Sequence, residues 1–182
     1  MKAILILLLS MFLMSCGSAR KMGIGGEDKF IDNDKFFVSS FYGTAKDPNT
    51  AKHIALLNCR GDLATKIKGK IMAGIESYAN QYQKSTEKKG MIRDESGKFE
   101  SNISSFVETE IGDATVIHGR MSEPNRKGEY TYFVAMQVSK DIVEKLAGQV
   151  EEVVSELPDN IKARINYDQE KFKEYLKQYM KK

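Results

Sequence analysis

Residues 35–71 of this 182-residue chain read KFFVSSFYGTAKDPNTAKHIALLNCRGDLATKIKGKI. The opening part of the stretch is rich in aromatic and β-branched residues, which is typical of a β-strand. Alternation along a strand would place Phe37 and Phe41 on one face. Val38 and Tyr42 would then lie on the opposite face. The stretch therefore predicts a strand with large side chains on both sides.

A long amphipathic helix is predicted directly after this strand. Asp47 and Pro48 suit the N-cap and the first helical position. Apolar residues then recur every three or four positions and form one stripe, made of Leu56, Cys59, Leu63, Ile67, Ile71, Ile75, Tyr78 and Tyr82. We expect this stripe to face the core. Gly61, Gly69 and Gly74 weaken the helix and favour a bend or a break near one of them.

The rest of the chain predicts a loop, a hairpin and further helices. Residues 84–98 are polar and predict a loop, which a short helix follows, with Ile103, Phe106, Val107 and Ile111 on its buried side. Two alternating segments around a turn at 124–128 predict an antiparallel hairpin. A helix should begin at Ile142, and a last one follows Asn166 and Gln169, which have capping-box spacing. We expect an α+β fold in which a small antiparallel sheet of about three strands is covered on one face by the long helix and shorter helices.

The N-terminal residues predict export and lipid attachment. Lys2 precedes an apolar run over 3–14, which is shorter than a membrane-spanning helix and typical of a signal peptide. Residues 13–16, Leu-Met-Ser-Cys, resemble the lipobox of bacterial lipoproteins, so the thiol of Cys16 is the predicted site of lipidation. The alternative is a soluble secreted protein with a chance cysteine. Several acyl chains would hold the mature protein stably on a membrane.

These features divide the chain into four predicted parts. Residues 1–15 are the signal peptide, 16–35 a lipidated flexible tether, 36–157 the α+β domain, and 158–182 a C-terminal amphipathic helix packing on it. Gly17 and Ser18 after the cysteine resemble sorting signals for the outer membrane. We therefore expect a lipid-anchored outer-membrane protein that faces the periplasm.

A family resemblance rests on two segments. Residues 39–71, SSFYGTAKDPNTAKHIALLNCRGDLATKIKGKI, and residues 128–146, GEYTYFVAMQVSKDIVEKL, resemble the small bacterial lipoprotein family founded on a twenty-kilodalton membrane antigen. The domain is also similar to the N-terminal part of a flagellar-associated periplasmic protein. Cys59 stands where a small residue such as alanine is usual. The resemblance implies an exported, lipid-anchored domain without an established enzymatic activity, and it supplies no catalytic residues.

The residues do not favour catalysis or metal binding. The chain has two histidines, His53 and His118, and neither lies at a spacing typical of a zinc site. We expect no enzymatic activity, no cofactor and no metal. The formal net charge of +3, with interspersed charges, disfavours a nucleic-acid partner. Cys59, on the apolar stripe, is expected to be a small buried hydrophobe, with a reactive thiol as the alternative.

Four residues form the candidate ligand or partner surface: His118, Arg120, Tyr130 and Tyr132. Core packing is the alternative explanation for the tyrosines. The favoured function is a non-enzymatic interaction or scaffold module that meets an envelope protein or a second copy of itself. The alternative function is binding or weak hydrolysis of a small ligand. That alternative requires a concave site that gathers His118, Arg120 and Tyr132 beneath residues 84–98.

Overall fold

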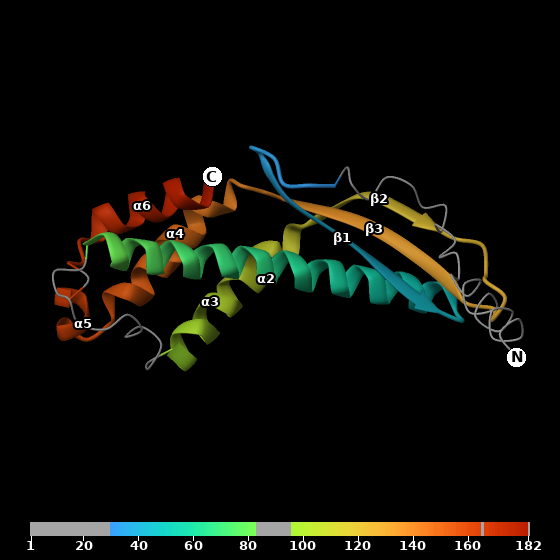
Figure 1. Cartoon of the computed structure of the whole chain (residues 1–182), viewed down its shortest axis with the longest axis horizontal. Helices are drawn as coiled ribbons and strands as arrows, with labels where there is room; N and C mark the ends of the chain where they lie inside the picture. Colours follow the sequence, from blue (N-terminus) through green and yellow to red (C-terminus); the bar gives the residue numbers. More distant parts are fainter. Residues whose placement is uncertain (1–29, 83–95, 165, 182) are drawn as a thin grey trace, which may run out of the picture.

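The computed structural model describes residues 30–82, 96–164 and 166–181. Its elements are β1 (Phe36–Ala45), α2 (Pro48–Tyr82), α3 (Ser96–Glu110), the 3₁₀ turn η3 (Ile111–Asp113), β2 (Thr115–Met121), β3 (Tyr130–Ser139), α4 (Ile142–Ser155), α5 (Asp159–Arg164) and α6 (Gln169–Lys181). Figure 1 shows α2 running the length of an elongated molecule, with the strands along one half and the other helices around the other half. The expected α+β class is confirmed.

The sheet has the order β1-β3-β2, and both pairs of neighbours are antiparallel. The predicted hairpin is therefore formed by β2 and β3. Its turn includes Gly128 at a φ of 73°, a backbone conformation that favours glycine, and the amide of Gly128 donates to the carbonyl of Asn125. A bulge between Val116 and His118 interrupts the register of β2.

The sheet has an inner face toward α2 and an outer face away from it. Phe37 pairs with Val138 and lies with it in the main core, so both belong to the inner face. Tyr42 pairs with Phe133, and these two pack together on the outer face. The predicted alternation along β1 is confirmed.

Helix α2 is one continuous helix of 35 residues, about 52 Å long at 1.5 Å per residue. The predicted start is confirmed, because the side chain of Asp47 accepts a hydrogen bond of 2.7 Å from the amide of Thr50. No break occurs at Gly61, Gly69 or Gly74. The buried stripe explains this continuity, since tertiary packing along it outweighs the low helix propensity of three glycines.

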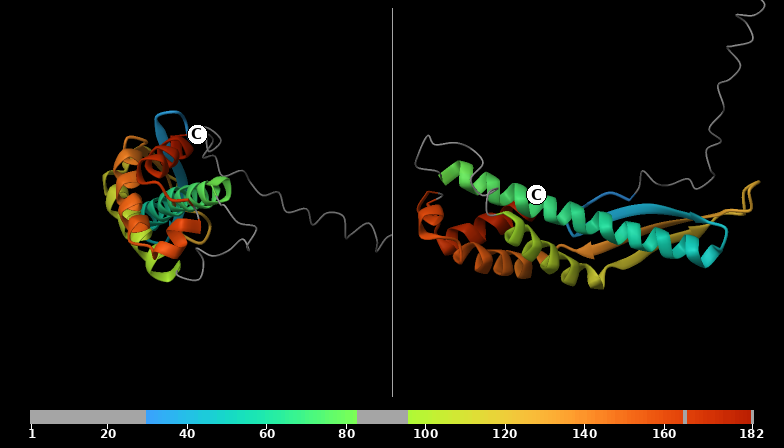
Figure 2. Two further views of the ribbon diagram at one scale, coloured as in Figure 1. Left: turned by 90° about the vertical axis from the view of Figure 1, so that its left-hand side faces the viewer. Right: turned by 90° about the horizontal axis from the view of Figure 1, so that it is seen from below.

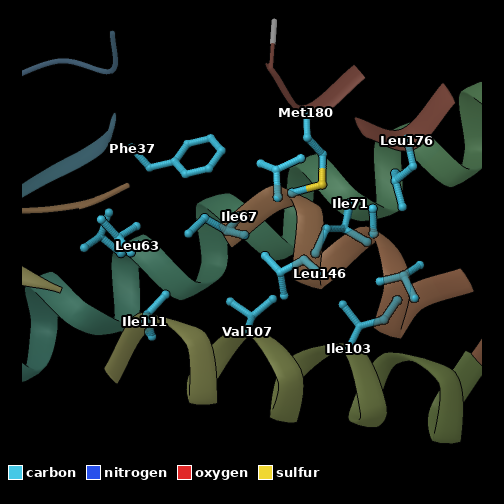
Figure 3. Close-up of a cluster of buried hydrophobic side chains, with 14 of the residues drawn as sticks. Phe37, Leu63, Ile67, Ile71, Ile103, Val107, Ile111, Leu146, Leu176 and Met180 are labelled. Atoms are coloured by element: carbon cyan, nitrogen blue, oxygen red, sulfur yellow. The ribbon is translucent and has the colours of Figure 1, made fainter. Parts of the chain in front are cut away.

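One hydrophobic core joins the helices to the sheet. Figure 3 shows side chains of β1, α3, η3, α4 and α6 meeting those of α2, among them Phe37, Leu63, Ile67, Ile71, Ile103, Val107, Ile111, Leu146, Leu176 and Met180. As Figure 2 also shows, α4 and α6 lie beside the C-terminal half of α2, away from most of the sheet. The predicted apolar stripe of α2 therefore packs against the sheet along one half of the helix and against other helices along the other half.

The C-terminal region differs from the single helix expected over 158–182. It contains two helices, α5 and α6, and Asp168 rather than Asn166 caps the second one. The amide of Lys171 donates to the Asp168 carboxylate, and this hydrogen bond lowers the pKa of that carboxyl. Asn166 instead has a φ of 50° in the turn between the helices, a conformation that asparagine tolerates. Phe172, Leu176 and Met180 of α6 are buried in the common core.

The loop expected over 84–98 is shorter than predicted at its C-terminal end, because α3 begins at Ser96. Residues 83–95 lie outside the described residues, as do the predicted signal peptide, Cys16 and the tether as far as residue 29. The residues predicted to be buried on the short helix are confirmed in part. Ile103, Val107 and Ile111 are buried, whereas Phe106 is half-buried.

At Gly43 the backbone of β1 lies very close to the backbone of α2. A β-carbon on Gly43 would lie 2.0 Å from the carbonyl oxygen of Ala51 and 2.5 Å from the amide nitrogen of Ala55. Both alanines are fully buried. Two small residues and one glycine therefore let the strand rest directly on the helix backbone.

We predict that Gly43→Ala lowers the free energy of unfolding by about 2–3 kcal/mol, because the backbone of α2 cannot move aside as a side chain would. Gly61→Ala is the matched control, since a β-carbon there meets nothing within 4 Å. It should raise stability by up to about 1 kcal/mol through helix propensity. Urea unfolding followed by circular dichroism measures both changes, and equal effects of the two substitutions would contradict the argument.

Candidate functional site

The sheet separates the four candidate surface residues into two pairs. His118 pairs with Ala135 and Arg120 pairs with Phe133, which places both on the outer face. Tyr132 packs against the main core on the inner face, and Tyr130 lies two residues before it on the same strand. Side chains on opposite faces of a sheet cannot line one hollow. The concave site proposed for His118, Arg120 and Tyr132 is therefore not formed.

Tyr132 has a packing role on the inner face. A β-carbon on Gly119 of β2 would lie 2.1 Å from the hydroxyl oxygen of Tyr132, so the ring passes directly over this glycine. Tyr132 is half-buried and contacts the common core. The surroundings of Tyr132 therefore match core packing, which was the alternative explanation for the tyrosines.

The outer face carries a small aromatic cluster of its own. Phe133 and Ala135 are buried there, and Phe30 and Tyr42 pack against them. The ring centroid of Phe30 lies 5.3 Å from that of His118 and 5.7 Å from that of Phe133. His118, an exposed residue of β2, thus contacts the aromatic rings of Phe30 and Phe133.

Residues 30–35, which the sequence assigned to the tether, pack on the domain and will be called the strap. The carboxylate of Asp32 accepts a hydrogen bond of 2.8 Å from the amide of Val38 and pairs with the Lys66 ammonium at 3.0 Å. The side chain of Asn33 accepts from the amides of Lys35 and Phe36 and turns the chain into β1. The strap therefore leads from the start of β1 over the outer face.

The polar composition of residues 17–34 concealed the strap in the sequence. The sequence feature that could have indicated the strap is short: the apolar pair Phe30 and Ile31 is followed by Asp32 and Asn33, which favour turns. Whether such a pair packs on the domain depends on the outer face of the sheet, which the sequence pattern does not place in space.

Strand β2 is the least covered part of the sheet. Residues 115–120 are all exposed, and α2 lies against β1 and β3. Val116 is 50% exposed and Ile117 is 40% exposed. A strand at the edge of a sheet also presents unpaired backbone groups. Apolar side chains and an outer edge of the sheet, unpaired among the described residues, therefore coincide on one strand.

Two lysines lie against the aromatic ring of Phe37. The ammonium groups of Lys70 and Lys140 are each 5.3 Å from the ring centroid, and they donate to the carbonyls of Met180 and Lys181. Burial, and next the charge of Lys140, lower the pKa of Lys70. The carbonyls at the C-terminus of a helix attract cations. This cluster therefore holds the end of α6 against the start of β1.

Cys59 is fully buried, as expected for a small hydrophobe on the stripe. Its thiol donates to the carbonyl of Ser39 at 3.2 Å, and burial raises its pKa. His53 is exposed on the same helix and shares no site with it. Within the described residues, no three or more His, Cys, Asp or Glu side chains gather in a way that would hold a metal ion.

Comparisons with protein-family models, curated proteins and solved structures find no match for this chain. Among the helices of the described residues, none combines the length and the apolar character needed to cross a membrane. The lipoprotein resemblance and the role of Cys16 therefore remain predictions from the sequence.

We predict that Cys59 is almost inert toward thiol reagents in the folded protein. Its raised pKa keeps the thiol protonated near pH 8, and burial blocks access. In the full-length chain carrying Cys16→Ala, Cys59 is the sole cysteine. Labelling by a thiol-reactive dye should be on the order of 100-fold slower in native buffer than in concentrated urea. Equal rates would contradict the buried position.

Proposed function

We propose that this chain is a lipid-anchored interaction module of a bacterial envelope, held at the outer membrane by acyl chains on Cys16 and facing the periplasm. The single observation that carries an interaction role is the exposure of β2, which offers Val116 and Ile117 at the outer edge of the sheet. Binding partners commonly use strand edges and exposed apolar groups of this kind.

The lipid anchor supports this role through effective concentration. A domain confined to a membrane surface meets other envelope proteins at a much higher local concentration than a free protein would. A modest patch such as β2 then suffices for association. The partner is an envelope protein or a second copy of this chain, and no chemical step is required of the residues on the sheet.

Cys16→Ala tests the anchor, and Cys59→Ala is the matched control because it changes the second cysteine of the chain. We expect Cys16→Ala to leave the outer-membrane fraction and to lose its acyl mass, because the thiol that carries the lipid is absent. Cys59→Ala should keep both. Cell fractionation and mass spectrometry make the measurement, and an unmodified, water-extractable natural chain would contradict the proposal.

A photo-crosslinking amino acid at Ile117 tests the binding surface in intact cells. We expect defined products from position 117, fewer of them in a Cys16→Ala background, and none from position 170 on the exposed surface of α6. We expect this result because the lipid anchor keeps the domain close to its partner and β2 provides the exposed contact surface. Equal products from positions 117 and 170 would show that β2 is not the contact surface.

A further inference from the structure

The strap, residues 30–35, lies on the outer face of the sheet and covers part of it. We propose that Phe30 is the internal occupant of a docking site for an extended peptide segment, and that a partner segment with an aromatic side chain displaces it. The site consists of Phe133, Ala135, Tyr42 and His118. This docking site is a second surface besides β2, and its ligand is an extended segment with an aromatic side chain.

The position of Phe30 indicates what the site accepts. Its ring is tilted by 46° against Phe133 and by 32° against His118, and the ring centroid of Tyr42 lies 5.2 Å from that of Phe133. Tilted aromatic arrangements at such distances are attractive beyond the area that they bury. Ala135, fully buried, contributes a small side chain at the base of this cluster. A flat aromatic ring delivered by an extended chain therefore fits the site.

Apart from Phe30, the described contacts of the strap are polar: Asp32 and Asn33 bond to nearby backbone amides, and the carbonyl of Lys35 accepts from the amide of Lys140. Ile31, the neighbour of Phe30, is 70% exposed and adds no apolar anchor. The ion pair of Asp32 with Lys66 joins two side chains that are each about one third exposed, and such pairs contribute little. Phe30 is therefore the main apolar attachment of the strap, and a competitor for its position would release the segment.

Release of the strap also frees a backbone group at the edge of β1. Asp32 of the strap accepts from the amide of Val38, whereas Lys66 of α2 donates to the carbonyl of the same residue and is not part of the strap. Val38 belongs to an outer strand of the sheet. An incoming extended segment offers a backbone carbonyl that replaces the Asp32 carboxylate at this amide, as in strand addition to a sheet edge.

Displacement would lengthen the connection to the membrane, a consequence that rests on the proposed anchor at Cys16. Six residues released from the sheet add up to about 20 Å of extended chain. Partner binding at the outer face would thereby let the domain move away from the lipid surface. The docking site itself does not depend on acylation.

The test uses a dye-labelled peptide with the sequence of residues 27–35, EDKFIDNDK, and the full chain purified in detergent. We expect the peptide to bind the Phe30→Ala chain at least about 10-fold more tightly than the natural chain, whose own Phe30 occupies the site. The matched control peptide carries Ala at position 30 and should bind neither chain. Fluorescence anisotropy gives the affinities. Equal binding to both chains, or equal binding of both peptides, would overturn the proposal.

A second variant keeps the test decisive if Phe30→Ala does not fold. The chain contains no tryptophan, so Phe30→Trp introduces a single indole reporter. Its emission should shift to longer wavelength when excess phenylalanine-containing peptide displaces it, and should not shift with the alanine peptide. An emission maximum of a solvent-exposed indole before peptide is added would overturn the proposal. Failure of the anchor would appear in cell fractionation and leave these results unchanged.

Discussion

The close contact between β1 and α2 at Gly43 is the constraint on which the rest of this structure depends. Because Gly43 has no side chain and Ala51 and Ala55 have small ones, the strand lies against the backbone of the helix. This contact sets the direction of α2 along the sheet. The positions of Cys59 and Leu63 beneath the inner face follow from it, and the thiol of Cys59 reaches the carbonyl of Ser39.

The length of α2 then divides the molecule into two parts with different surroundings. Its N-terminal half covers β1 and β3, and its C-terminal half packs against α3, α4 and α6. Near α6 the fit is again close, since a β-carbon on Gly74 would lie 2.8 Å from Leu176. One helix is too narrow to cover three strands, so β2 stays exposed. The proposed interaction surface is thus a consequence of how a single helix covers a sheet.

The two faces of the sheet also decide which candidate residues can act together. Tyr132 contributes to the core on the inner face, whereas His118 and Arg120 lie on the outer face with Phe133. The outer face is closed in part by the strap, whose Phe30 contacts both His118 and Phe133. In the proposed docking, an aromatic side chain of a partner segment takes the place of Phe30 on this face. The strap therefore connects the predicted anchor to the sheet.

The sequence by itself determined the elements whose signals are local. The alternation in β1, the cap at Asp47, the stripe of α2 and the β2–β3 hairpin could all be predicted, because each depends on residues a few positions apart. Tertiary structure alone decided the continuity of α2 through its glycines, the turn at Asn166 and the docking of Phe30. It also decided that His118 and Tyr132 lie on opposite faces. These outcomes depend on contacts between residues far apart in the chain, whose energies outweigh local preferences, and no short pattern records which distant surfaces meet.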